Sequence, residues 1–195
     1  MDRQSHIAII ILAAGASSRM GTPKQLLPYQ NSSLIRSLAG TALHSKAEKV
    51  IIVLGHWYED IRKELDGLDV ELVHNSEWKS GMSSSLRMGL NVLGKNIEAA
   101  IVLLCDQPKV TTALLDAIIR TYEHSRKPII ACRYGTTVGV PALFDRSLFE
   151  ELQKLQGDIG AKKIIERRAS DRRVIEFPEG DVDIDTPEEY QRIKI

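Results

Sequence analysis

Short runs of consecutive apolar residues alternate along the chain with longer stretches in which apolar residues recur every three or four positions. The short runs are typical of strands buried on both faces, and they occupy residues 7–12, 50–54, 70–73, 99–104 and 128–132. The longer stretches have the helical period, and their apolar stripes fall within residues 34–43, 57–65, 82–93 and 114–119. This alternation predicts a mainly parallel sheet with helices on both faces.

The last third of the chain is less regular. Its segments are predicted as extended chain around turns at 133–141, short helices at 148–155 and 161–167, a last strand at 174–177 and a terminal helix at 187–193. No low-complexity linker or internal repeat divides the sequence. We therefore expect residues 1–195 to form a single α/β domain, a three-layer α/β/α arrangement around a mainly parallel, Rossmann-like sheet.

The charge balance excludes some classes of partner, and the cysteine content indicates a compartment. The chain has 26 basic and 26 acidic residues, so it offers no global field for nucleic acid or an anionic membrane. The apolar run at 7–14 is too short to span a bilayer, and no targeting segment is evident. Cys105 and Cys132 lie in apolar runs and form no CxxC pair, as expected for buried cysteines in a reducing compartment. We expect a cytoplasmic protein that binds a small molecule.

The first predicted strand continues into a loop of small residues that ends in two basic side chains. The loop spans 12–24 and reads Leu-Ala-Ala-Gly-Ala-Ser-Ser-Arg-Met-Gly-Thr-Pro-Lys. Small residues let a backbone approach a ligand, and Arg19 and Lys24 suit phosphate oxygens. Gly15 and Gly21 lack the spacing of a dinucleotide loop, and no Walker A sequence follows. The alternative is a tight turn with two solvated basic residues.

Five segments, taken in order, resemble the MobA-like nucleotidyltransferases, and most of all the molybdenum cofactor cytidylyltransferases (MocA-type). They are the loop at 12–24 with its continuation to Pro28, then 75–87, 103–108, 157–161 and 183–189. The resemblance implies the fold of the glycosyltransferase-A type. It also implies transfer of a nucleotidyl group from a nucleoside triphosphate to a phosphate on the acceptor, with release of pyrophosphate. Residues 1–110 would bind the nucleotide and residues 111–195 the acceptor.

The same resemblance implies roles for individual residues on the nucleotide side. Arg19, Lys24 and Asp106 would form the catalytic set. The nucleotide would be bound by Leu12, Ala13, Ala14, Gly15, Ser17, Arg19, Lys24, Ser83, Ser84 and Ser85. Ala14 stands where the guanylyltransferases have a second glycine, which favours cytosine over guanine. For the three serines, capping of the helix that they open is the alternative.

A magnesium ion is expected at the carboxylates. Mg²⁺ takes hard oxygen ligands and keeps several waters, so one or two carboxylates suffice, and Mn²⁺ is a possible substitute. Asp106 at the end of the fourth strand is the first ligand, Asp185 the second and Asp183 its reserve. The alternatives are a turn carboxylate before Pro108 and, for the later pair, a helix start.

On the acceptor side the resemblance implies contacts from Gly157, Asp158, Gly139 and Pro141, although Asp158 could instead cap a helix. Val140 departs from the Gly-His-Pro of MocA-type enzymes, which leaves the acceptor open. The resemblance implies transfer of CMP from CTP to molybdopterin, with a molybdoenzyme as the expected recipient of the product. The alternatives are guanylyl transfer, another acceptor such as methylerythritol phosphate or a sugar 1-phosphate, and a non-catalytic maturation factor for the molybdenum cofactor.

Overall fold

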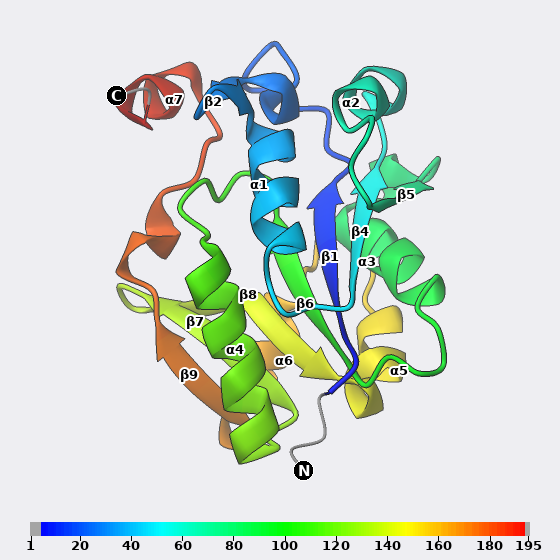
Figure 1. The fold of residues 1–195 in the computed structure, drawn as a ribbon, viewed down its shortest axis with the longest axis vertical. Helices are drawn as coiled ribbons and strands as arrows, with labels where there is room; N and C mark the ends of the chain where they lie inside the picture. The colour runs from blue at the N-terminus through cyan, green and yellow to red at the C-terminus, as the bar shows by residue number, and fades with distance from the viewer. Residues whose placement is uncertain (1–4, 194–195) are drawn as a thin grey trace.

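The computed structural model describes residues 5–193 and is built around one sheet of seven strands. Strand β1 (Ile7–Ala13) lies near its centre (Figure 1). The order is β5 (Glu71–His74), β4 (Lys49–Leu54), β1, β6 (Ala99–Leu104), β8 (Thr137–Asp145), β7 (Ile129–Tyr134) and β9 (Arg172–Glu176). Strands β5, β4, β1 and β6 are parallel neighbours, whereas β8 is antiparallel to both β6 and β7.

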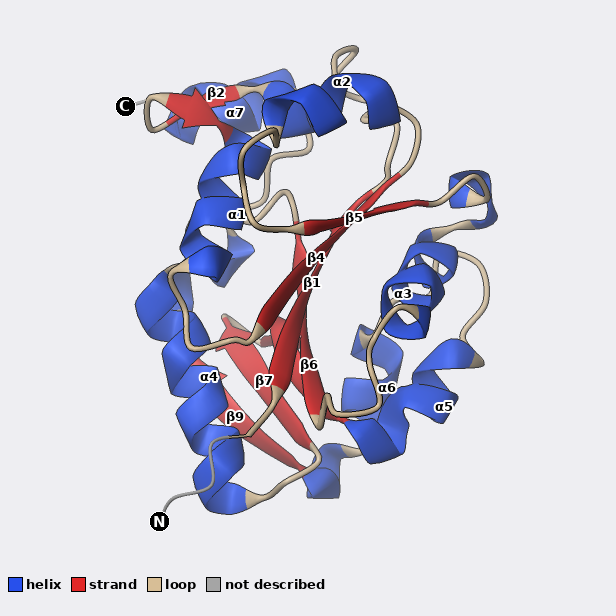
Figure 2. Cartoon of the chain, turned by 45° about the vertical axis from the view of Figure 1, so that its right-hand side comes forward, coloured by secondary structure: helices blue, strands red, loops and turns tan. Residues whose placement is uncertain are grey.

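Helices cover the two faces of this sheet, as Figure 2 shows. One layer contains α1 (Leu34–Leu43) and α4 (Thr112–Ser125), and the other contains α3 (Met82–Asn91), α5 (Phe149–Gln153) and α6 (Lys162–Arg167). Strand β1 supplies both cores, because Ile9 and Ile11 pack into the first and Ile10 and Leu12 into the second. The prediction of a mainly parallel α/β/α fold is confirmed. Among the described residues, none of the helices has the length and apolar character needed to cross a membrane.

Three elements gather where β1 ends (Figure 1). They are α2 (Tyr58–Glu64), the terminal α7 (Pro187–Ile193) and the hairpin of β2 (Pro28–Tyr29) and β3 (Ser32–Ser33). Tyr190 of α7 holds the hairpin through a hydrogen bond to the Pro28 carbonyl. Loops and short elements therefore lie beyond the carboxyl ends of the central strands.

The structure differs from the predicted elements mainly in the last third. The extended chain at 133–141 becomes the β7–β8 hairpin, which contains a cis Val140–Pro141 bond. The last strand begins at Arg172 rather than at 174, since β9 is an edge strand and tolerates polar residues. The helix expected at 148–155 is a 3-10 turn followed by α5, and α4 is longer than its apolar stripe.

Candidate active site

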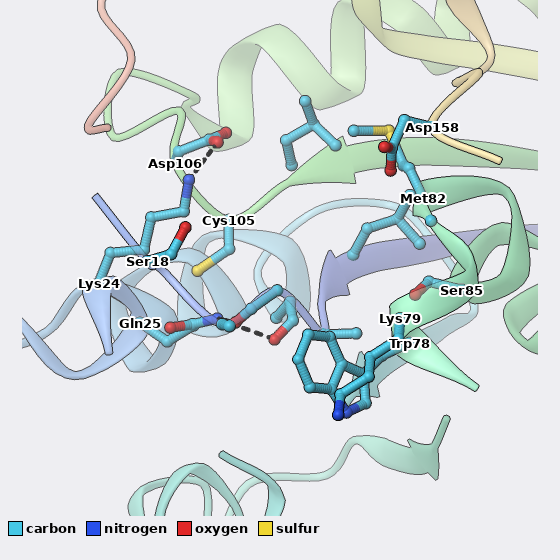
Figure 3. Close-up of a pocket in the computed structure, with 17 residues that line it drawn as sticks. Ser18, Lys24, Gln25, Trp78, Lys79, Met82, Ser85, Cys105, Asp106 and Asp158 are labelled. Atoms are coloured by element: carbon cyan, nitrogen blue, oxygen red, sulfur yellow. Dashed lines mark hydrogen bonds and ion pairs between the residues drawn. The ribbon is translucent and has the colours of Figure 1, made fainter. Parts of the chain in front are cut away.

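A cavity of about 370 Å³ opens at the carboxyl ends of β1 and β6. Its walls come from residues 12–16 and Ser18 at the end of β1, from Lys24 and Gln25, from residues 104–106 at the end of β6, and from Trp78, Lys79, Gly81, Met82, Ser85 and Asp158. Figure 3 shows Lys24 and Asp106 toward one end of this cavity, and Trp78, Met82 and Asp158 toward the other. The fold thus brings residues from four of the five sequence segments to one place.

The loop after β1 has its carbonyl groups paired by donors that lie behind it. The Gln25 amide nitrogen lies 3.0 Å from the carbonyl oxygens of both Ala13 and Gly15. On the other side, the His56 backbone N–H donates to Ala14 and the Trp57 indole N–H donates to Ala16. The loop therefore has few acceptors left to offer a ligand.

Its donors, in contrast, remain available. Within the described part of the chain, the N–H groups of Gly15, Ala16 and Ser18 make no hydrogen bond. Backbone N–H groups without a partner attract anionic oxygens, as they do in phosphate-binding loops. Ser17 has a φ of 55°, a left-handed conformation that costs a non-glycine residue free energy unless its surroundings hold it. The loop is therefore held in one shape with its donors free.

Lys24 joins two carboxylates from distant parts of the chain. Its ammonium nitrogen lies 2.6 Å from Asp106 Oδ2 and 3.0 Å from Asp185 Oδ1. Arg19, which is exposed, donates to the other oxygen of Asp185 at 2.8 Å. The Asp185 backbone N–H in turn donates to Glu189, so the same segment both starts α7 and presents a carboxylate to the cavity rim.

These contacts keep the site charged. Burial would lower the pKa of Lys24, but the two carboxylates beside it raise the pKa above its ordinary value. For Asp185, burial would raise the pKa, but Lys24 and Arg19 bring it below the usual range. Asp183 makes no ion pair among residues 5–193; burial together with the charges of Asp106 and Asp185 outweighs the charge of Lys24 and raises its pKa to about 6. Asp185 is therefore the better ionised of the two candidate ligands.

The carboxylates have the donor atoms that a hard cation needs. Asp106 Oδ1 is buried and has no hydrogen-bond partner in the described chain, so one lone-pair-bearing oxygen is left for a ligand. Within residues 5–193, the structure contains no group of three histidine, cysteine or acidic side chains arranged around one point. Asp106 and Asp185 could hold a cation such as Mg²⁺ with water completing its shell, because that ion needs only one or two protein carboxylates.

The far end of the cavity is suited to a planar ring. Trp78 and Met82 form apolar walls there, and Ser85, which accepts a hydrogen bond from Asn75 at 3.0 Å, supplies a hydroxyl. Asp158 completes this end (Figure 3). Aromatic and thioether walls with a few polar groups are typical of sites for heteroaromatic ligands.

The Asp158 segment is fixed to the start of α3 through main-chain atoms. Gly81 has a φ of 94°, and a Cβ placed there would lie 2.3 Å from the carbonyl carbon of Gly157. The Gly157 carbonyl oxygen accepts hydrogen bonds from the backbone N–H and the hydroxyl of Ser83. Glycine is therefore required at Gly81 both by its conformation and by the close approach.

Comparison with known proteins identifies the family. The MobA-like NTP transferase domain matches residues 9–173. The chain belongs to this family. It is 27% identical over 195 residues to nicotine blue oxidoreductase of Paenarthrobacter nicotinovorans, with 94% of each chain covered. It is 31% identical over 127 residues to the bifunctional protein GlmU of Streptomyces griseus, which covers 63% of this chain and 26% of that longer protein.

Solved structures of the same fold agree. The crystal structure of Rv0371c from Mycobacterium tuberculosis aligns with a TM-score of 0.87 at 30% identity, covering 98% of this chain and all of that one. The same protein has also been solved in complex with manganese, and that structure aligns with a TM-score of 0.79 at 31% identity over 97% of this chain and 98% of that one.

Several residues expected in the MobA-like site lie outside the cavity wall. Ser83 and Ser84 are buried and bond to neighbouring carbonyl groups, so within the described chain they serve the start of α3. Gly139 and Pro141 are buried within β8. Ser17, Arg19, Asp183 and Gly157 are not on the wall, and neither is Asp185, which reaches the cavity only through its contact with Lys24.

The structure also adds residues that the sequence analysis did not select. They are Ala16, Ser18, Gln25, Trp78, Lys79, Gly81, Met82, Leu104 and Cys105. Cys105 is buried, which raises the pKa of its thiol and keeps it neutral. The sequence positions of Gln25 and Trp78 did give a signal. Gln25 adjoins Lys24, and Trp78 lies within residues 75–87, the second of the five segments that resemble the MobA-like family.

Proposed function

We propose that this MobA-like protein is a magnesium-dependent nucleotidyltransferase that moves CMP from CTP to the terminal phosphate of molybdopterin and releases pyrophosphate. The observation that carries the proposal is the Lys24 ammonium held between Asp106 and Asp185 beside a loop of free backbone donors. Positive and negative groups together suit a metal–triphosphate complex, which neither sign alone would bind well.

The reaction needs positioning and charge stabilisation more than proton transfer. The acceptor phosphate is already an anionic nucleophile, so no general base is required. The loop N–H groups, Arg19 and Lys24 would hold the triphosphate oxygens and stabilise charge that develops on the leaving pyrophosphate. Asp106 and Asp185 would hold Mg²⁺, which when bound neutralises charge at the reacting phosphate.

Two observations support the metal assignment. One oxygen of Asp106 is buried without a partner, and Asp185 is kept ionised by its basic neighbours. In addition, a relative about 31% identical has been solved with manganese. We propose that this chain likewise binds a divalent ion, Mg²⁺ with Mn²⁺ as a substitute, at Asp106 and Asp185, with Asp183 in reserve.

For the nucleobase we propose cytosine at the end of the cavity formed by residues 12–15, Ser85 and Trp78. The small side chains of the loop permit close approach of the base to the backbone, and Ala14 in place of a glycine favours the smaller ring. The acceptor would enter from the half formed by residues 111–195, where Asp158 faces the same cavity. Because Val140 replaces a polar ring of MocA-type enzymes, the acceptor is the feature that most needs a test.

The test is a panel of pyrophosphate-release assays with CTP, GTP, ATP and UTP and Mg²⁺, each without acceptor and with molybdopterin, methylerythritol phosphate or a sugar 1-phosphate. We expect release only with CTP and molybdopterin together. Release with GTP, or with methylerythritol phosphate or a sugar 1-phosphate as acceptor, would replace the substrate assignment while keeping the chemistry. Tight molybdopterin binding with no release from any nucleotide would refute the transferase proposal and favour a maturation factor.

A further inference from the structure

Gln25 is a buried polar side chain whose hydrogen bonds all go to the nucleotide loop. It is 1% exposed and belongs to the 3-10 turn Lys24–Leu26 that follows the loop. The turn directs Lys24 into the cavity, while the Gln25 amide reaches back to the loop, as Figure 3 shows. An amide buried to this extent normally uses both of its ends, and this one does.

The two ends of the amide fix different features of the loop. The nitrogen donates to the carbonyl oxygens of Ala13 and Gly15, both at 3.0 Å. The oxygen accepts from the Ser17 hydroxyl at 3.2 Å, and that hydroxyl accepts from the Lys24 backbone N–H at 3.1 Å. One side chain therefore occupies two loop acceptors, supports the left-handed Ser17 and connects the loop to the backbone of Lys24.

We infer that Gln25 is a positioning residue for the nucleotide: it presets the shape in which the loop donors and Lys24 meet the phosphates. This inference rests on the proposed function, because it needs a nucleotide in this cavity. Without the amide, the Ala13 and Gly15 carbonyls would lose their partner and Ser17 would lose a contact that holds its positive φ. The loop would then sample other conformations, and ordering it again would weaken nucleotide binding.

The main variant is Gln25→Met, which keeps the length of the side chain and removes every hydrogen bond. We expect the dissociation constant for Mg·CTP, measured by titration calorimetry, to rise about 10- to 100-fold. In turnover assays the KM for CTP should rise by a similar factor, with a smaller change in kcat, because the transferring groups themselves are intact. Gln25→Glu keeps the acceptor oxygen but lacks the amide donors, so it should fail to restore the affinity.

Tyr122→Phe is the matched control. It also removes a side-chain hydrogen bond, the partly buried one from Tyr122 to Asp145 at 2.5 Å, but on α4, and neither residue lines the cavity. It should lower the melting temperature and leave the CTP affinity unchanged. Equal CTP affinity in wild type, Gln25→Met and Tyr122→Phe would overturn the inference and leave Gln25 a purely structural residue.

Two further measurements keep the outcome decisive. If Gln25→Met does not fold, Ser17→Ala breaks the same network at its half-buried end and should weaken CTP binding about 3- to 10-fold; unchanged binding by that folded variant would count against the inference. If wild-type protein binds none of the four triphosphates, the proposed function fails, which is distinct from a variant that binds as well as wild type.

Discussion

The Lys24 ammonium lies between the two carboxylates at which a divalent cation would be bound. This arrangement leads to a prediction about metal affinity. Removal of a positive charge from the cavity should increase affinity for a metal in the absence of nucleotide. The perturbation is Lys24→Met, which keeps the aliphatic part of the side chain and removes the ammonium that contacts Asp106 and Asp185. A metal that enters the wild-type site must first displace that ammonium.

The magnitude follows from the two contacts. The contact with Asp106 is short and mostly buried, and such a charge-assisted hydrogen bond contributes about 1.5 kcal/mol. Asp185 is one-third exposed, so solvent screening reduces its contact to about 0.5 kcal/mol. The sum of about 2 kcal/mol corresponds to a dissociation constant roughly 30-fold lower in the variant. Transfer activity should nevertheless be lost, because Lys24 no longer meets the triphosphate.

The assay is Mn²⁺ binding to nucleotide-free protein, measured from the electron paramagnetic resonance signal of the free ion. Lys79→Met is the matched control, since Lys79 lines the same cavity but lies over the Trp78 ring, 5.5 Å from its centroid. It removes the same charge without freeing a carboxylate and should change the affinity less than about threefold. Mn²⁺ affinity that is unchanged or weaker in Lys24→Met would refute the reasoning. The corollary is that metal and nucleotide bind wild-type protein synergistically.

Three other perturbations test separate parts of the structure. Asp106→Asn should lower turnover at least about 100-fold with an unchanged circular dichroism spectrum, and normal turnover would remove Asp106 from the site. Gly55→Ala should lower the free energy of unfolding in urea by about 1–3 kcal/mol, because its Cβ would lie 2.6 Å from a carbonyl oxygen of the loop. A Cβ at Gly15 would meet nothing within 4 Å, so Gly15→Ala should lower that free energy by less than about 0.5 kcal/mol while still weakening CTP binding. Equal losses of stability in the two variants would contradict the packing. Burial would raise the pKa of Asp145, but hydrogen bonds, one of them from Tyr122, bring it below its ordinary value, so this stabilisation is present above about pH 4 and is lost as the pH falls through the folded-state pKa. Tyr122→Phe should therefore lower the free energy of unfolding by about 1–2 kcal/mol at pH 7 and by less at pH 3, and an equal loss at both pH values would count against the linkage.

The central strands were predictable because burial on both faces leaves no position for a polar residue. Strand β8 was not, since Pro141 normally argues against a strand within a sheet. The structure shows why it is tolerated: the β7–β8 pairing passes from Gly139 to Ala142, and the register shifts at this irregularity. Val140 and Pro141 therefore have no partner in the register of that pairing. Since no partner residue faces the proline there, its missing N–H costs the β7–β8 pairing no hydrogen bond.

The residues of the candidate site that lie in loops directly after strands were predictable. Lys24 and Asp106 come from loops after parallel strands, and such loops meet at one edge of the sheet. The serines after Gly81 were less predictable, because the same residue type either caps a helix or faces a ligand, and only Ser85 lines the cavity. Gln25 donates to backbone carbonyl groups, and such contacts leave no periodicity in the sequence, so only its position beside Lys24 pointed to it.

The main-chain contact between Gly81 and Gly157 has a consequence for how specificity can change. One segment begins α3 beside the end of the cavity proposed for the nucleobase, and the other carries Asp158. The two backbones are in direct contact, so a substitution that moves one segment displaces the other. Selection for a new acceptor would then also disturb the nucleobase preference. In a directed-evolution experiment, we expect mutations that alter the two preferences to arise as compensating pairs across this junction.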